Sequence, residues 1–376
     1  MTGVVALDGV VRHYEWGSRT AIPSLLGVDA DGQPWAELWF GAHQHDPSPV
    51  PDRGTTLDAL LASDPQRHLG STSAVRFDGR LPYLMKVLAA DRALSIQVHP
   101  TLEQARAGFA REEAQGIPQD APHRNYKDAN HKPELLCALT PFDALCGFRP
   151  VPDTIDLLAE LALPDLGFLA DRLRGDDPLR AAFTAVLEHP DIEPVVAALT
   201  ARVAGAADGP LYATRLGAQD APGDVGVVLT LLLNYVRLAP GEAIYLGAGN
   251  VHAYLRGTGV EIMASSDNVL RCGLTPKHID VPELLRITDF TSLADPLWPA
   301  VGGRFEMPVH DFALTRIEVD GSTGLHDDGP CIVLCTSGSV SVGDVPVRPG
   351  HAAFVPAGEA ITITGVGEVF VASTGR

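Results

Sequence analysis

The chain has 376 residues, 45% of them hydrophobic, so it is long enough to bury the cores of two or three domains. Its formal net charge of −19 argues against a surface for nucleic acid or anionic membranes, although a few cations in a pocket would suffice to bind a small anion. The longest apolar run, 225–233, is too short to span a bilayer, and the N-terminus lacks the pattern of a signal peptide. Five cysteines without a CxxC pair argue against disulfides or a thiolate zinc site. We therefore expect a cytoplasmic protein with no nucleic-acid or membrane partner.

The order of sequence patterns along the chain predicts a mainly β fold with an α-helical insertion. Residues 101–116 predict a helix, and 152–206, in which Ala and Leu recur every three to four positions, predict several more. Residues 224–237 predict a further helix, and strands return after 238. Short β-type runs punctuated by Gly and Pro fill the first hundred residues: GVVRHYEW (9–16), AELWFGAH (36–43), YLMKVL (83–88) and LSIQVH (94–99).

An internal repeat predicts two β-barrels of the same kind. LAPGEAIYLGAGNVHAY (238–254) aligns without gaps to VRPGHAAFVPAGEAITI (347–363). Each copy contains a PG turn, a strand, a Gly turn and another strand, which is typical of a hairpin in a jelly-roll barrel. We expect His252 to do more than pack, because the second copy has Ile361 in its place. The predicted units are a first barrel (1–150 and 238–295), a helical insertion (151–237) and a C-terminal barrel (296–376).

Four residues from three strand-like segments form a candidate metal site. Gln97 and His99 are two residues apart in SIQVHP, so in a strand both point to the face opposite Ile96 and Val98. On its own, this pattern also fits a half-buried strand with a polar solvent face. With Glu134 from NHKPELL and His252 from the repeat, the set supplies two imidazoles, a carboxylate and an amide oxygen. Such ligands without thiolates suit Zn²⁺, with Fe²⁺, Mn²⁺ or Co²⁺ as alternatives.

Several charged residues accompany the candidate ligands. The segment GVEIMASSDNVLRCGLTPKHID (259–280) follows His252 on the same predicted barrel. Each charge could equally lie on a solvated surface, and Arg271 is notable only because its neighbours are apolar. The residues of interest are Glu261, Asp267, Arg271 and Lys277 in this segment, with His131 and Lys132 before Glu134 and Lys86 in an earlier strand.

These segments resemble the signature blocks of type I phosphomannose isomerases. The blocks LPYLMKVL, LSIQVHP, NHKPE, GNVHAY and SSDNVLRCGLTPK occur in the family's order, and YEWGS and AELWFGAH extend the resemblance from about residue 13 to 290. The tail resembles a cupin barrel more loosely. The resemblance implies a zinc-dependent cupin enzyme with an inserted helical domain that interconverts mannose 6-phosphate and fructose 6-phosphate. It further implies that Gln97, His99, Glu134 and His252 bind one zinc ion per chain and that Arg271 lies in the active site.

The chemistry implied by this resemblance leaves some residue roles open. Moving a proton between C1 and C2 of the sugar through an enediolate requires a base, a group that stabilises negative charge and a phosphate contact. Candidates for the base are Lys132, Glu261 and Asp267, and candidates for the phosphate contact are Lys86, Lys132 and Lys277. Arg271 is a poor proton shuttle and is expected to stabilise the enediolate or to anchor the substrate.

Two alternative functions remain compatible with the residues. Two histidines and a carboxylate also form the iron site of a cupin dioxygenase, which metal content and oxygen consumption would reveal. A non-catalytic sugar-phosphate sensor would bind the ligand without exchanging the C2 proton. We expect the C-terminal barrel to hold no metal and the protein to be a monomer.

Overall fold

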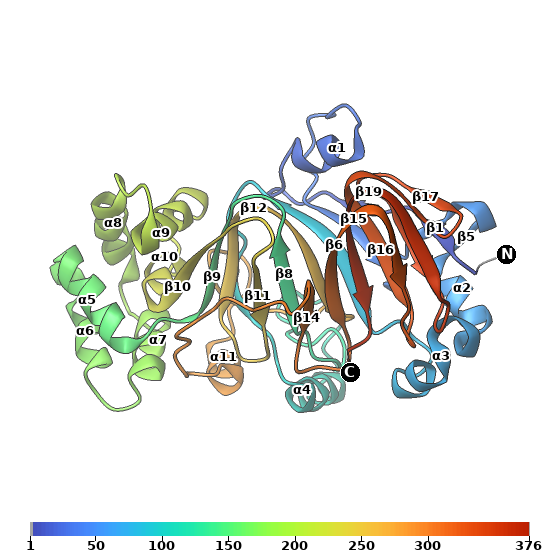
Figure 1. Cartoon of the computed structure of the whole chain (residues 1–376). Helices are drawn as coiled ribbons and strands as arrows, with labels where there is room; N and C mark the ends of the chain where they lie inside the picture. The colour runs from blue at the N-terminus through green and yellow to red at the C-terminus, as the bar shows by residue number, and fades with distance from the viewer. Residues whose placement is uncertain (1–2, 376) are drawn as a thin grey trace.

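The computed structural model describes residues 3–375 and is mainly β, with two large antiparallel sheets and eleven α-helices in that range. Figure 1 shows the helices α5–α10 gathered at one end of the molecule and the strands of the C-terminal sheet at the other. The strands that carry the candidate metal ligands lie between these two ends.

The central sheet contains ten strands and follows the path β10-β9-β12-β6-β3-β2, with β7, β8, β11 and β13 paired beside it. Each of the four β-type runs expected in the first hundred residues contributes a strand to this sheet. In chain order, these strands are β2, β3, β6 and β7. The strands are β2 (Val10–Arg12), β3 (Glu37–Gly41), β6 (Tyr83–Ala90), β7 (Ile96–Val98), β8 (Glu134–Ala138), β9 (Phe142–Phe148), β10 (Leu233–Leu238), β11 (Ala243–Leu246), β12 (His252–Ala264) and β13 (Leu270–Gly273).

The thirteen-residue strand β12 connects the two halves of this sheet. Its first half pairs with β7 and β9, and its second half pairs with β6 and β8. The change of partners falls at Gly257, whose φ of 125° is open mainly to glycine and whose missing Cβ would meet Phe142 and the Pro141 carbonyl. Gly257 therefore marks the point at which β12 passes from one pair of neighbouring strands to the other.

The second sheet has seven strands and includes one from the start of the described chain. Strand β1 pairs antiparallel with β18, with Val5 opposite Phe354. The sequence analysis placed β1 in the first unit with the rest of 1–150, but β1 instead joins the sheet of the C-terminal unit. The buried Val5 and Leu7 explain this placement, because β18 offers them an apolar face. The strands are β1 (Val5–Leu7), β14 (Arg304–Glu306), β15 (Ala313–Leu325), β16 (Cys331–Val342), β17 (Val345–Val347), β18 (Ala352–Val355) and β19 (Ile361–Ser373), and β4 (Pro49–Val50) pairs separately with β5 (Thr55–Thr56).

The helix expected at 101–116 and those expected at 152–206 are present. The first, α4 (Leu102–Ala114), begins with a capping box in which Thr101 and Gln104 each bond the other's backbone N–H. The helices of the insertion are α5 (Val151–Leu161), η2 (Pro164–Leu166), α6 (Gly167–Leu173), α7 (Pro178–Leu187), α8 (Ile192–Val203) and α9 (Gly209–Asp220). Helix α9 lies between the two helical segments expected in the insertion and was not itself expected. The other unexpected helices lie within the β-rich parts: α1 (Ala21–Leu26), η1 (Pro51–Arg53), α2 (Leu57–Ser63), α3 (Pro65–Arg76) and α11 (Val281–Ile287).

The helix expected over 224–237 is wrong in its second half. The chain forms the short helices α10 (Gly226–Leu229) and η3 (Thr230–Leu232), and then becomes strand β10, which pairs with β9. A continuous apolar run fits a buried helix and a buried strand equally well, so periodicity could not place this boundary. The helical part of the insertion therefore ends at residue 232 rather than 237.

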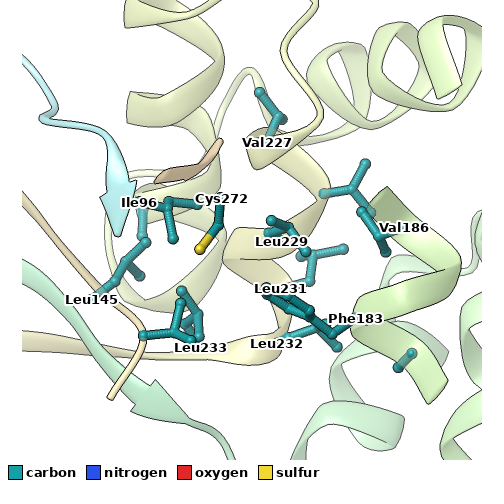
Figure 2. Packing of buried hydrophobic residues seen from close by; sticks show 14 of the residues in the cluster. Ile96, Leu145, Phe183, Val186, Val227, Leu229, Leu231, Leu232, Leu233 and Cys272 are labelled. Carbon is teal, nitrogen blue, oxygen red and sulfur yellow. The ribbon is translucent and has the colours of Figure 1, made fainter. Parts of the chain in front are cut away.

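The helices of the insertion pack directly on the strands that carry the site. Figure 2 shows Ile96, Leu145 and Cys272 from β7, β9 and β13 facing Val227 and Leu229 from α10. Ile96 and Val98 are fully buried in this apolar cluster. Because side chains alternate along a strand, Gln97 and His99 point to the opposite face, as the sequence predicts.

The sequence repeat is also a structural repeat. Strands β11 and β12 have the same lengths and spacing as β18 and β19, and their aligned turns contain glycine in the left-handed region. One aligned pair is Gly249 (φ 79°) and Gly358 (φ 71°). A Cβ at Gly249 would lie 2.9 Å from the Cβ of Asp289, whereas a Cβ at Gly358 would meet no atom within 4 Å.

This difference predicts unequal effects of the same substitution in the two copies. Gly358→Ala should destabilise the protein by about 1–2 kcal/mol, the usual cost of a left-handed alanine. Gly249→Ala should cost more, because it adds a steric clash to the same backbone strain. Urea unfolding of the two zinc-free variants measures both effects, and equal losses would contradict the prediction.

Candidate metal centre and active site

Three of the predicted ligands converge at the end of β12. Atoms of His99, Glu134 and His252 that could bind one metal ion all lie within 4.8 Å of one another. The Glu134 carboxylate lies between the imidazoles, with Oε1 at 3.5 Å from His99 Nε2 and Oε2 at 3.4 Å from His252 Nε2. All three residues are buried, with at most 1% of any of them exposed.

Strand register adds Gln97 and Arg271 to the same face. Gln97 of β7 lies directly opposite His252 of β12 and, on its other side, directly opposite Arg271 of β13. Residues opposite one another in an antiparallel pair project to the same face with Cβ atoms about 5 Å apart. The register therefore brings the expected amide ligand and the expected arginine beside the His99–Glu134–His252 cluster.

Unpaired buried atoms show that the cluster fits a metal ion. His99 Nε2, His252 Nε2 and Glu134 Oε2 are buried without a hydrogen-bond partner among the described residues. The other nitrogen of each ring lies near a backbone carbonyl, His99 Nδ1 at 2.8 Å from Asn268 O and His252 Nδ1 at 3.0 Å from Asn250 O. Donation of Nδ1–H to these carbonyls leaves each Nε2 lone pair directed into the cluster, the usual arrangement of a metal-binding histidine.

The charges of the cluster also suit a cation. Burial lowers the pKa of His99 to about 4, so its ring is neutral at neutral pH. Burial alone would raise the pKa of Glu134, but Lys132 and His99 hold it well below its usual range. Lys132 Nζ lies 2.9 Å from Glu134 Oε1 and compensates the buried carboxylate.

A second buried group of charges surrounds Lys86. Its Nζ lies 3.0 Å from Glu261 and 3.4 Å from Glu37, which also accepts a hydrogen bond from Trp39 Nε1 at 2.8 Å. Burial disfavours the charged amine, but the two carboxylates raise the pKa of Lys86 above its ordinary value. Burial also raises the pKa of Glu261, against the effect of Lys86. Lys86 and Glu261 are therefore paired with each other.

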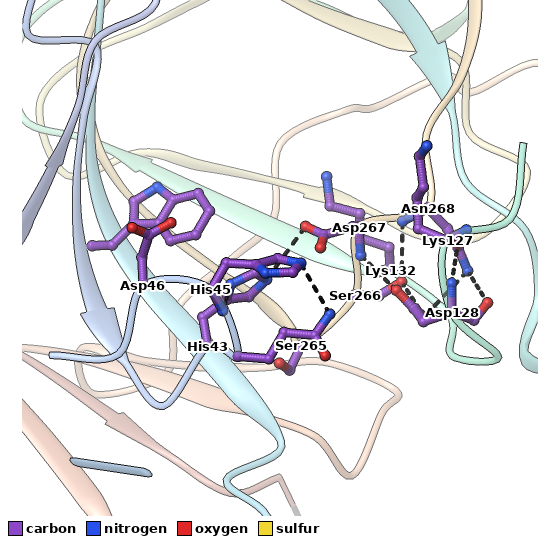
Figure 3. Close-up of polar contacts among 12 residues, drawn as sticks. His43, His45, Asp46, Lys127, Asp128, Lys132, Ser265, Ser266, Asp267 and Asn268 are labelled. Atoms are coloured by element: carbon purple, nitrogen blue, oxygen red, sulfur yellow. Dashed lines mark hydrogen bonds and ion pairs between the residues drawn. The ribbon is translucent and has the colours of Figure 1, made fainter. Parts of the chain in front are cut away.

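Asp267 is the most accessible of the expected base candidates. Its side chain is 36% exposed, against 10% for Lys132 and 3% for Glu261. Its Oδ1 lies 3.3 Å from His43 Nε2, and Figure 3 shows His43 and Lys132 on either side of it. Burial would raise the pKa of Asp267, but the His43 contact and the positive charges of Lys132 and Lys86 lower it below its ordinary value.

A cavity of about 940 Å³ adjoins the site through Asp267. Its lining also includes His43, Asp128, His131 and Asp311. Of these, His131 and Asp311 form an ion-pair contact of 3.0 Å. None of the three clustered metal-binding residues lines the cavity, so it lies beside the metal centre rather than around it.

Arg271, which lies opposite Gln97, interacts electrostatically with Lys277. Arg271 lies close enough to Lys277 to lower its pKa, and burial and Lys127 lower it further. Burial lowers the pKa of Arg271 itself. The candidate phosphate contacts from the sequence were Lys86, Lys132 and Lys277. Lys86 is held between Glu37 and Glu261, and Lys132 is paired with Glu134, whereas the charge of Lys277 interacts with that of Arg271.

The structure also identifies site residues that the sequence analysis did not select. Tyr254 is two residues from His252 on β12, and its buried hydroxyl has no hydrogen-bond partner among the described residues. The same two-residue spacing that linked Gln97 to His99 would have identified it. Glu37 and His43 belong to AELWFGAH, but nothing in that run indicated that they would meet Lys86 and Asp267.

Comparison with known proteins agrees with this geometry. Residues 4–151 match the family described as phosphomannose isomerase type I, catalytic domain. The chain is 39% identical over 379 residues to a mannose-6-phosphate isomerase of Escherichia coli (strain K12), with 96% of each chain covered. It is 33% identical over 414 residues to a mannose-6-phosphate isomerase of Homo sapiens, with 96% of this chain and 95% of that one covered.

Solved structures of the same kind share the fold. A crystal structure of mannose 6-phosphate isomerase in its holo, zinc-bound form superposes with a TM-score of 0.92 at 36% identity and covers both chains completely. A mutant of phosphomannose isomerase from Salmonella typhimurium gives a TM-score of 0.93 at 36% identity, again with both chains covered completely. Identity of this level over nearly the whole length shows that the chain belongs to the type I phosphomannose isomerase family.

Proposed function

We propose that the protein is a zinc-dependent isomerase that interconverts mannose 6-phosphate and fructose 6-phosphate through an enediolate. The observation that carries the proposal is the buried His99–Glu134–His252 cluster, whose three unpaired atoms face one another in a chain of this family. A zinc-bound relative of the same fold supports zinc as the ion. A coupled isomerase assay on purified protein, with and without chelator, tests the proposal directly.

The zinc ion would be held by His99, Glu134 and His252, with Gln97 as a fourth ligand. Support for Gln97 comes from its position opposite His252, since an amide oxygen there lies on the correct face of the sheet. A zinc ion bound there would act as a Lewis acid toward the sugar oxygens. The side chains of the chain itself perform the remaining tasks.

Asp267 is the base in this proposal. It takes the proton from C2 of the aldose, the C2–H electron pair forms the C1=C2 bond, and the carbonyl oxygen becomes an oxyanion. Transfer of the O2 proton to the O1 oxyanion, formation of the C2=O bond and return of the proton from Asp267 to C1 then give the ketose. Access favours Asp267 over Glu261 and Lys132, which are buried in ion pairs with Lys86 and Glu134.

Arg271 and Lys277 hold the negative charges of the substrate and the transition state. Arg271 lies on the metal-facing side of the sheet, opposite Gln97, so we assign it to the developing oxyanion. Lys277, near Arg271 and Lys127, is assigned to the phosphate. Lys86 and Lys132 instead act within the site by neutralising the buried carboxylates Glu261 and Glu134.

Both β units are proposed to be cupin-type jelly rolls, of which only the first binds metal. In the second unit, strand register places Leu325, Cys331 and Ile361 where the first has Gln97, Glu134 and His252. Leucine and isoleucine cannot bind a cation, and burial raises the pKa of Cys331 above its ordinary value. The C-terminal unit is thus assigned a packing role.

The proposed setting is a cytoplasmic monomer. All five cysteines are free and buried, as suits a reducing compartment. No helix among residues 3–375 is long and apolar enough to cross a membrane.

The metal assignment predicts that His252→Ala loses both zinc and activity while the protein stays folded. Its matched control is His351→Ala in the second barrel, where the imidazole Nδ1 lies 3.1 Å from the nearby Pro349 carbonyl. Elemental analysis of dialysed protein should find one zinc per chain in the wild type and in His351→Ala. Two zinc ions per chain, or full activity after chelation, would contradict the assignment.

The roles of the two basic residues predict different kinetic defects. Arg271→Ala should lower kcat by about 100-fold or more, since it removes a charge that acts in the transition state. Lys277→Ala should mainly raise KM, and Arg53→Ala, an exposed cation elsewhere, should change neither constant. A rise in KM alone for Arg271→Ala would show that it only binds the substrate.

The His43 contact predicts a shift in the pH profile. Because His43 helps to lower the pKa of Asp267, His43→Ala should raise that pKa, and the base should then become protonated at higher pH. The acidic limb of kcat/KM against pH should therefore move to higher pH. His45→Ala is the control, since its ring packs near His43 but makes no ion-pair contact with Asp267. An unshifted acidic limb in His43→Ala would exclude Asp267 as the titrating base.

A further inference from the structure

The site depends on two segments that have no regular secondary structure. Residues 265–269 connect β12 to β13 and carry Asp267, and residues 127–133 lead to Lys132 and Glu134. A strand is held in place by its ladder of backbone hydrogen bonds, but these segments have no such ladder. Their conformation must therefore be held by other contacts.

The side chain of Asn268 supplies many of these contacts. It is fully buried, and its Oδ1 accepts hydrogen bonds from the backbone N–H groups of Lys127 and Asp128 at 2.7 and 3.2 Å. Its Nδ2 donates to the backbone carbonyls of Asp128 and Asn130 at 2.9 and 2.8 Å. One amide thus bonds four backbone groups of the other segment, as Figure 3 shows in part.

Asp128 makes the reciprocal contacts. Its Oδ2 accepts a hydrogen bond from the backbone N–H of Asp267 at 2.8 Å, and its Oδ1 accepts one from the Ser266 hydroxyl at 2.8 Å. Oδ1 also accepts a bond from the backbone N–H of Asn130 at 2.8 Å. Asn268 and Asp128 therefore tie the two segments together from both sides, and we call this pair the 128–268 clamp.

The clamp is connected to three residues of the active site: His99, Asp267 and Lys132. The backbone carbonyl of Asn268 accepts the hydrogen bond that orients the ring of His99. The backbone of Asp267 is fixed through Asp128, and Asn130 lies two residues before Lys132, the partner of Glu134. A polar network of this kind aligns groups that a loop alone would leave free to move.

We propose that the 128–268 clamp is a positioning device that aligns His99 for the metal ion and Asp267 for the substrate. The clamp acts through the backbone of the two segments. The proposal deepens the proposed function and rests on it for the role of Asp267, whereas the effect on His99 concerns metal affinity alone.

The central test compares zinc affinity in Asn268→Ala and Asp128→Asn, measured by competition with a chelator. Each variant should weaken zinc binding by about 10–100-fold, the usual effect of losing a contact behind a metal ligand. Asp128→Asn keeps the shape of the side chain, so it decides the matter if Asn268→Ala fails to fold. Zinc affinity within twofold of the wild type in the folded variants would overturn the proposal.

Thr214→Val is the matched control, because it removes a buried hydrogen bond outside the clamp and so lowers the stability of the fold without changing the clamp. The Thr214 hydroxyl is fully buried in the helical insertion and contacts the Thr230 hydroxyl at 2.8 Å and the Pro210 carbonyl at 3.2 Å. This control should lower the thermal midpoint of the zinc-free protein but leave zinc affinity unchanged. A similar fall in zinc affinity in Thr214→Val would show that general destabilisation explains the effect, and would overturn the proposal.

The double variant and the activity assay separate the remaining possibilities. Because both residues belong to one network, the combined loss of zinc affinity should be smaller than the product of the single losses, whereas a full product would contradict a shared clamp. With zinc at saturation, kcat should still fall in both single variants because Asp267 is misaligned, and an unchanged kcat would remove that half of the proposal. The wild type could lack isomerase activity while the clamp variants still bind zinc more weakly than the wild type. That result would refute the proposed function but would support the proposal that the clamp aligns His99 for the metal ion.

Discussion

Glu134 is the charge on which the arrangement of the site depends. A buried carboxylate costs several kcal/mol unless charges or hydrogen bonds compensate it, and here Lys132 and two imidazoles surround it at 2.9–3.5 Å. His252 belongs to β12, His99 directly follows β7 and Lys132 lies in a loop, so the central sheet must pair correctly before the charge is compensated. The change of partners at Gly257 makes that pairing possible, because it lets β12 pair with β7 and β9 at one end and with β6 and β8 at the other.

The helical insertion and the polar site lie on opposite faces of the same strands. Ile96 and Val98 are buried against helices, while Gln97 and His99 face the metal centre. This division supports strand β7, which is only three residues long, on its apolar side. A site that must hold several groups within fractions of an ångström benefits from such support. The irregular segments cannot use this device, and buried polar contacts hold them instead.

Much of the fold and of the metal cluster could be predicted because local patterns determine them. Alternation in SIQVHP gave the faces of β7, and the gapless repeat matched two hairpins with identical strand lengths. The end of the helical insertion was misplaced, because an apolar run such as 225–233 carries no periodic signal when every side of it is buried. The contacts of His43, Glu37 and Asn268 were not predicted for another reason: each joins residues far apart in the chain, and no local pattern specifies the partner. The roles of Gln97 and Arg271 remain predictions, which the register of β7 supports.

The pairing of β1 with β18 has a consequence for how the chain folds during synthesis. Strand β1 emerges first, yet its partner lies near residue 352, so nearly the entire chain must be made before the pair can form. Until then, β1 lacks its strand partner, although it can already contact β4 and η1, and a pairing of such long sequence separation is slow to form. Deletion of the last strands would therefore expose an edge at the other end of the chain, which is the kind of surface that templates aggregation. The C-terminal unit is for this reason a closing element of the whole molecule and not an appended module.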